Sequence, residues 1–75
     1  MNKKELINQR ITQLFGEIGG KMGQYYYDSY YGCVFKVVNQ GGGVSRVLTV
    51  GKPTQALEIL DNILQYQLYM KNKEI

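Results

Sequence analysis

The spacing of hydrophobic positions changes twice along this chain of 75 residues. Beginning at Asn2, a candidate N-cap, apolar side chains recur every three or four residues as far as Met22, which is typical of one stripe of an amphipathic helix. Gly19 and Gly20 follow the last strongly periodic positions and can adopt the left-handed conformation that ends many helices. The pattern therefore predicts a first helix that begins at Asn2 and ends near Gly19.

From residue 24 to residue 50 the period becomes two-fold, and aromatic and β-branched residues dominate. Strands are predicted over residues 33–39 and 44–50, because the glycine-rich segment 40–43 between them can supply the positive φ values of a hairpin loop. Residues 25–27 form a further short strand that turns at Asp28 and Ser29. The middle of the chain is thus expected to be an antiparallel meander.

A second helix is expected after Gly51, with Pro53 in its first turn, where the missing N–H is harmless. Its apolar face is broader than one sheet needs to cover it, so part of this face is expected to contact the first helix or a second subunit. The face comprises Ala56, Leu57, Ile59, Leu60, Ile63, Leu64, Leu68 and Met70.

These elements make one small α+β domain over residues 1–75 with the order αβββα, or αββα if the tyrosine segment is not a strand. Neither an internal repeat nor a linker divides the chain. Both helices are expected to pack on one face of the sheet.

The register of the hairpin decides which side chains that face contains. Pairing Gln40 with Gly43 places Cys33, Phe35 and Val37 on the core side, together with Leu48 and Val50. The same scheme assigns Tyr26 and Tyr31 to the core and Tyr27 and Tyr30 to the open side, and it leaves Tyr25 unassigned. A shift of one residue would reverse every assignment.

Tyrosine is concentrated in one place: five of the seven tyrosines lie in residues 25–31. A phenol ring buries a large apolar area while its hydroxyl still requires a polar partner, so tyrosine suits half-exposed surfaces that meet another molecule. This cluster is the strongest functional signal in the chain.

The net charge of +3 allows a nucleic-acid partner without requiring one. A domain of this size buries only roughly 60% of its unfolded surface, and a single cysteine excludes an internal disulfide, so oligomerisation is the expected support. The chain has no signal-peptide core and no apolar run long enough for a membrane span, so a cytoplasmic location without membrane contact is expected.

Catalytic and metal-binding chemistry has little support in the sequence. Histidine is absent, and Cys33 begins an apolar strand, where it is most often a small core residue. Glu58 and Asp61 are too few for a dedicated cation site. We therefore expect a protein that is not an enzyme and has no cofactor, metal or small-molecule substrate.

The element order resembles the αβββα layout of double-stranded-RNA-binding domains, with Ala56 where that family's closing helix carries an alanine. The family's basic motif at the start of that helix is replaced here by residues 52–55, of which only Lys52 is basic. The resemblance is one of layout, and it assigns no family.

The function expected from these patterns is binding of another protein, or homo-oligomerisation, through the open sheet face and the tyrosine strand. The expected partner-binding residues are Tyr25, Tyr27, Tyr30, Val34, Lys36, Val38 and Val47. The alternative is a nucleic-acid-binding domain in which tyrosines stack on bases and cations pair with phosphates. Its expected contacts are Lys21, Lys36, Arg46 and Lys52.

Overall fold

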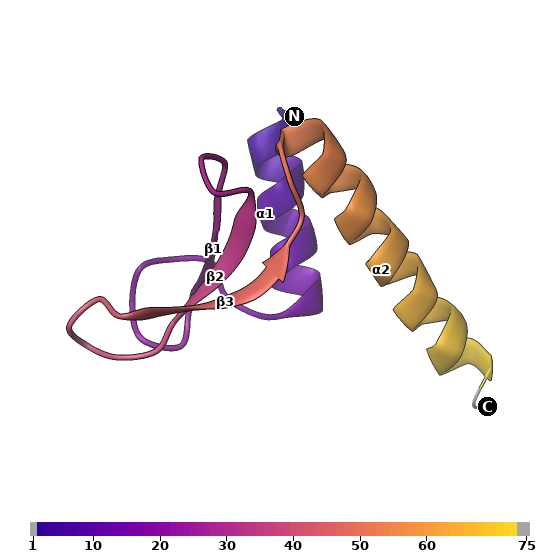
Figure 1. Cartoon of the computed structure of the whole chain (residues 1–75). Coiled ribbons are helices and arrows are strands. Elements are labelled where there is room, and N and C mark those ends of the chain that lie inside the picture. Colours follow the sequence, from indigo (N-terminus) through magenta and orange to yellow (C-terminus); the bar gives the residue numbers. More distant parts are fainter. Residues whose placement is uncertain (1, 74–75) are drawn as a thin grey trace.

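The computed structural model describes residues 2–73 and shows a small α+β domain with the predicted order αβββα (Figure 1). A three-stranded antiparallel sheet, in the order β1-β2-β3, lies beside helix α1, and helix α2 packs against α1. The elements are α1 (Lys3–Leu14), β1 (Tyr25–Asp28), β2 (Cys33–Val37), β3 (Val44–Thr49) and α2 (Pro53–Lys73). The predicted fold class is confirmed.

Helix α1 begins where the sequence predicts but ends five residues early. The Asn2 side chain accepts a hydrogen bond from the Glu5 backbone N–H at 2.9 Å, as an N-cap does. After Leu14 the helix ends in a turn at Phe15, and Ile18 then forms a parallel bridge with Tyr25. The predicted end near Gly19 is wrong because Ile18 reaches the core from an extended segment, beside the first strand.

The predicted tyrosine strand is present as β1 and pairs with β2. Tyr26 lies opposite Phe35, and Tyr27 lies opposite Val34. Tyr27 and Val34 both face the helices, where Val34 is completely buried. Because side chains alternate along a strand, Tyr26 and Phe35 point to the opposite side, which we call the open face.

A bulge in β3 determines which side chains face the helices. Arg46 pairs with Phe35 and Leu48 with Val34, so Val47 has no partner on β2. This extra residue moves Leu48 to the face that Val34 occupies. The predicted core side is therefore wrong for β2, because the helices cover the face with Val34 and Phe35 lies on the open face. Leu48 and Val50 contribute to the core as predicted, and Cys33 and Val37 are buried as predicted.

The core lies between the sheet and the two helices. Its fully buried members are Ile7 and Ile11 of α1, Val34 and Val50 of the sheet region, and Ala56 and Leu60 of α2. The helices run side by side from the same end of the molecule (Figure 1), and Arg10 of α1 forms an ion pair with Asp61 of α2. Neither of the two helices within residues 2–73 is long and apolar enough to cross a lipid bilayer.

Candidate functional site

Four aromatic rings form a continuous cluster on the open face, which we call the aromatic surface: Tyr26, Tyr30, Tyr31 and Phe35. The ring centroids are 5.6 Å apart for Tyr26 and Phe35, and 6.2 Å apart for Phe35 and Tyr31. Tyr31 meets Tyr30 edge to face at 5.0 Å and 88°. Tyr30 is 88% exposed and Tyr31 is 64% exposed, so the outer half of the cluster is open to solvent.

The connection between β1 and β2 holds the two outer rings in place. The Asp28 carboxylate accepts hydrogen bonds from the backbone N–H groups of Tyr30 (2.8 Å) and Tyr31 (3.2 Å). This is the turn-forming role that the sequence predicts for Asp28. The Gly32 N–H closes the loop by donating to the Asp28 carbonyl at 2.8 Å. The tyrosines are thus presented from an ordered turn.

Gly32 also ties this turn to the start of α2. Its carbonyl accepts hydrogen bonds from the backbone N–H groups of Val50 and Gly51, both at 2.8 Å. Gly32 has a φ of +66°, and a Cβ at this position would lie 3.0 Å from the Gly51 Cα. A glycine is required here both by the left-handed conformation and by the close approach of the two backbones.

The structure divides the tyrosine cluster differently from the prediction. Tyr30 is exposed, as expected. Tyr26 and Tyr31 were expected in the core, but they lie on the open face because the helices cover the other side of the sheet. Tyr27, expected on the open face, packs against the core, and so does Tyr25, which had no assigned side.

Tyr27 satisfies its hydroxyl inside the protein. The hydroxyl donates a hydrogen bond to the Gly51 carbonyl at 2.5 Å. Burial raises the pKa of Tyr27 above the usual phenol value of 10.0, and the neighbouring Asp28 and Cys33 reinforce the shift because their anions repel a phenolate. Tyr27 therefore helps to hold the strand against the α2 junction, which is a structural role.

Other members of the predicted partner-binding set are scattered. Val34 is 0% exposed, so its predicted place on the open face is wrong. Lys36, two residues after Val34, lies on the same face as Val34 and not on the open face where it was predicted. Its Nζ lies 5.7 Å from the centroid of the Tyr25 ring. Val38 and Val47 are exposed, at 46% and 38%, but Val38 follows the end of β2 and Val47 is the bulged residue of β3.

The four predicted nucleic-acid contacts do not all share the face of the aromatic surface. Arg46 lies opposite Phe35 and is exposed on the open face. Lys36, the next position along β2 from Phe35, points to the other side. Lys21 lines a hollow beside Asn39 in the loops, and Lys52 precedes α2.

The residues with catalytic potential have structural surroundings. Cys33 is buried, and its Sγ lies 3.3 Å from the Tyr31 carbonyl oxygen and 3.6 Å from Thr49 Oγ1. Asp61 is paired with Arg10, whereas Glu58 is exposed. Within residues 2–73, no group of three or more histidine, cysteine, aspartate or glutamate side chains is placed to hold a metal ion.

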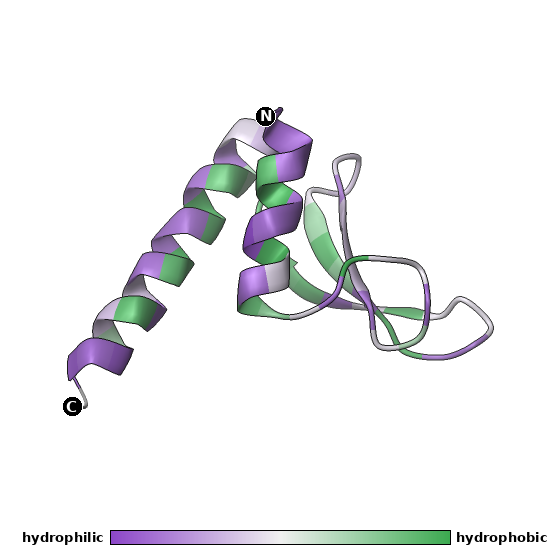
Figure 2. Cartoon of the chain, turned by 180° about the vertical axis from the view of Figure 1, so that it is seen from behind, coloured by the Kyte–Doolittle hydropathy of each residue, from purple (hydrophilic) through white to green (hydrophobic). Residues whose placement is uncertain are grey.

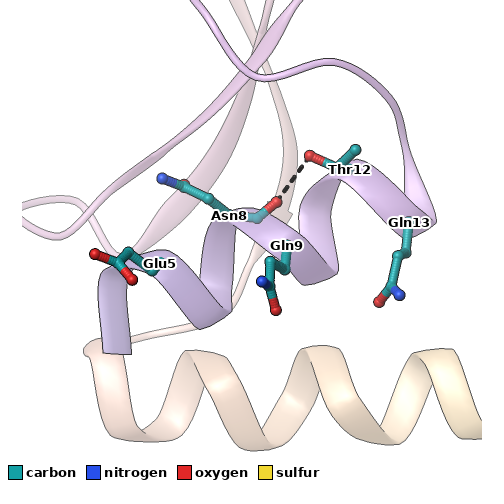
Figure 3. A pocket seen from close by; sticks show the side chains of 5 residues that line it. All are labelled: Glu5, Asn8, Gln9, Thr12 and Gln13. Atoms are coloured by element: carbon teal, nitrogen blue, oxygen red, sulfur yellow. Dashed lines mark hydrogen bonds between the residues drawn. The ribbon is translucent and has the colours of Figure 1, made fainter. Parts of the chain in front are cut away.

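A hollow with a volume of about 680 Å³ lies on the polar side of α1. Figure 3 shows the side chains that line it, among which the Thr12 hydroxyl donates to the Asn8 carbonyl at 2.9 Å. Glu5 is the one ionisable residue of this lining, which therefore lacks a nucleophile with an adjacent base. The lining residues are Glu5, Asn8, Gln9, Thr12 and Gln13.

A smaller hollow of about 390 Å³ lies where both helices begin. Its ionisable members are two lysines and Tyr27, whose hydroxyl is occupied by the Gly51 carbonyl. The lining residues are Asn2, Lys3, Lys4, Ile7, Tyr27, Ser29 and Pro53. We find no catalytic arrangement among them.

Sequence reasoning missed Phe35, Tyr26 and Tyr31 as surface residues. The pairing of β1 with β2 was predicted correctly as to which side chains share a face. In the predicted register and in the observed one, odd-numbered residues of β2 share a face with even-numbered residues of β1. The covered face of β2 was wrong, and so was the β2–β3 register, which placed Leu48 on the side of Phe35 and not on the side of Val34. No protein-family model, no curated protein and no solved structure matches this chain.

Proposed function

We propose that this chain is a non-enzymatic domain that binds another protein through the aromatic surface. The observation that carries the proposal is a chain of four touching rings, two of them mostly exposed, on the sheet face opposite the helices. Exposed aromatic side chains are the commonest anchors of protein interfaces. Rings held by their neighbours and by an ordered turn lose little conformational entropy on binding.

The surroundings of the rings suggest the chemistry of the partner. Arg46 lies opposite Phe35 on the neighbouring strand and is exposed on the same face. Asp28, the acidic residue nearest in sequence to Tyr26, Tyr30 and Tyr31, has its carboxylate occupied by two backbone N–H groups. A complementary partner therefore offers an apolar groove for Tyr30 and Tyr31 with a carboxylate placed to meet Arg46.

A displayed peptide library, selected against the immobilised wild-type domain, tests this proposal. Tyr31→Ser is the test variant and Tyr69→Ser is its matched control, because the two tyrosines are 64% and 59% exposed and Tyr69 lies on α2. We expect Tyr31→Ser to weaken the selected peptides by roughly 5- to 30-fold, the effect of losing one interface anchor. A selection without binders, or binders equally affected by both changes, would refute the proposal.

Nucleic-acid binding is the second candidate, and the position of Arg46 beside the rings supports it, together with the net charge of +3. An exposed cation next to stacked aromatic rings is the combination that single strands use. Fluorescence anisotropy with labelled single-stranded oligonucleotides should then show binding that weakens as salt is raised. The absence of binding at low salt would exclude this candidate.

A further inference from the structure

Helix α2 extends well beyond the helix that supports it. The Lys3 Nζ donates to Thr54 Oγ1 at 2.7 Å, and Arg10 pairs with Asp61; both pairs are 51 residues apart in sequence. The two helices therefore run parallel with this constant offset, which places Leu14, the last residue of α1, level with Gln65. Residues 66–73 of α2 lie past the end of α1, and Figure 1 shows this part of α2 diverging from the rest of the domain.

The unsupported part of α2 carries apolar side chains. Figure 2 shows the green hydrophobic stripe of α2 continuing towards its C-terminal end. Tyr66, Leu68 and Met70 are 64%, 47% and 37% exposed. Short helical segments are marginal in water unless a face is packed, so an exposed apolar end of a helix is a surface suited to a second helix.

One set of these residues follows the spacing of a coiled-coil seam. Ile59, Ile63, Tyr66 and Met70 are separated by four, three and four positions. Asp61, which holds α1, projects from the other flank of α2, because two residues correspond to more than half a turn of helix. The seam lies on the flank of α2 beside its contact with the core: Ile59 packs against the core, Ile63 is half-buried, and Tyr66 and Met70 are exposed.

We propose that α2 pairs antiparallel with α2 of a second copy of this chain through this seam. With the two-fold axis between Leu64 and Gln65, Ile63 lies level with Tyr66 of the other copy and Ile59 lies level with its Met70. Each layer then combines one isoleucine with one larger, flexible or aromatic side chain. This inference is independent of the aromatic surface, which lies on the sheet.

The charges along α2 favour a second copy in this orientation. The half before the axis contains the exposed Glu58, and the half after it contains Lys71 and Lys73; Asp61 is already paired with Arg10. An antiparallel pair places the acidic half of each helix beside the basic half of the other and opposes the two helix dipoles. A parallel pair would place like charges side by side.

Space and size are also consistent with a second copy. Because α1 accompanies only the first part of α2, the free end of one copy can lie along the supported half of the other. The seam from Ile59 to Met70 is about 17 Å long, shorter than a standard interface needs, so we expect a dissociation constant on the order of 10 μM. A domain with a core this small gains stability from such pairing.

Sedimentation velocity over a wide concentration series tests the association. We expect a monomer–dimer equilibrium in the wild type, and Tyr66→Lys to weaken it at least about tenfold. Gln65→Lys is the matched control, because it adds the same charge one residue away and off the seam, and Tyr31→Ser should also leave the dimer intact. A wild type that stays monomeric, or equal weakening by Tyr66→Lys and Gln65→Lys, would overturn the proposal.

The orientation is measured separately by spin-label distances. A nitroxide at Lys73→Cys, three residues after Met70 and therefore on the seam side of α2, in a Cys33→Ser background, should give an intermolecular distance of about 25–30 Å in the antiparallel dimer. A parallel pair would bring the labels to about 10 Å, near the distance between packed helix axes. The shorter distance would contradict the antiparallel arrangement.

Discussion

Replacing Tyr27 by phenylalanine removes one hydroxyl and leaves the packed ring in place. In the wild type this hydroxyl donates to the Gly51 carbonyl at 2.5 Å, and it joins β1 to the residue that precedes α2 by two positions. The free energy of unfolding should therefore fall by about 1 kcal/mol, the usual net value of one intramolecular hydrogen bond. For a domain of this size that corresponds to a melting temperature about 4–8 °C lower.

The same hydrogen bond makes a prediction about alkaline pH. Because burial raises the pKa of Tyr27 above 10.0, the unfolded chain loses this proton at a lower pH than the folded chain does. The resulting stability is fully present below pH 10.0 and is lost as the pH rises through the folded pKa. The stability difference between wild type and Tyr27→Phe should therefore shrink as the pH is raised above that value.

Urea unfolding followed by circular dichroism, at neutral pH and in steps above pH 10, measures both effects. Every other titratable group is common to the two proteins, so its contribution cancels in the difference. Tyr30→Phe is the control, because the ring is 88% exposed and no hydrogen bond to its hydroxyl is present within the described chain. Equal stability of wild type and Tyr27→Phe at neutral pH, or a difference independent of pH, would show that the hydroxyl does not hold the junction.

Two further changes probe the turn that presents the aromatic surface. Gly32→Ala should lower the free energy of unfolding by about 1–3 kcal/mol, since it combines a φ of +66° with a Cβ 3.0 Å from the Gly51 Cα. Gly42→Ala is the control, because Gly42 has a φ of +88° but open space around it, so this change measures the backbone effect alone. An equal loss of stability in both variants would contradict the steric argument. Asp28→Ala should cost about 1 kcal/mol in urea unfolding because two backbone N–H groups lose their acceptor, whereas Asp28→Asn keeps an acceptor oxygen and should be close to wild type.

The elements of this fold could be read from the sequence because their signals are local. The Asn2 cap, the period of α1 and the position of Pro53 each depend on neighbouring residues, and the structure agrees with all three. The end of α1 was less predictable. Ile18 has the spacing of a helical stripe, yet it reaches the core from an extended segment, so periodicity alone could not distinguish the two conformations.

The aromatic surface depends on a feature that leaves no clear trace in the sequence. Val47 is a β-branched residue among strand residues, and nothing in its type marks it as the unpaired position of a bulge. The bulge is favoured by packing, because it brings Leu48 and Val50 to the side of Val34, where Ile11 and Leu60 complete the core.

Covering that side leaves Phe35 and its opposite neighbour Tyr26 on the open face. Tyr31, which lies in the ordered turn, packs edge to face against Phe35, and Tyr30 packs against Tyr31. A single extra residue in β3 therefore decides which tyrosines of the cluster are available to a partner. It follows that the candidate binding surface is a consequence of core packing on the other side of the sheet, and a prediction that treats each strand alone cannot locate it.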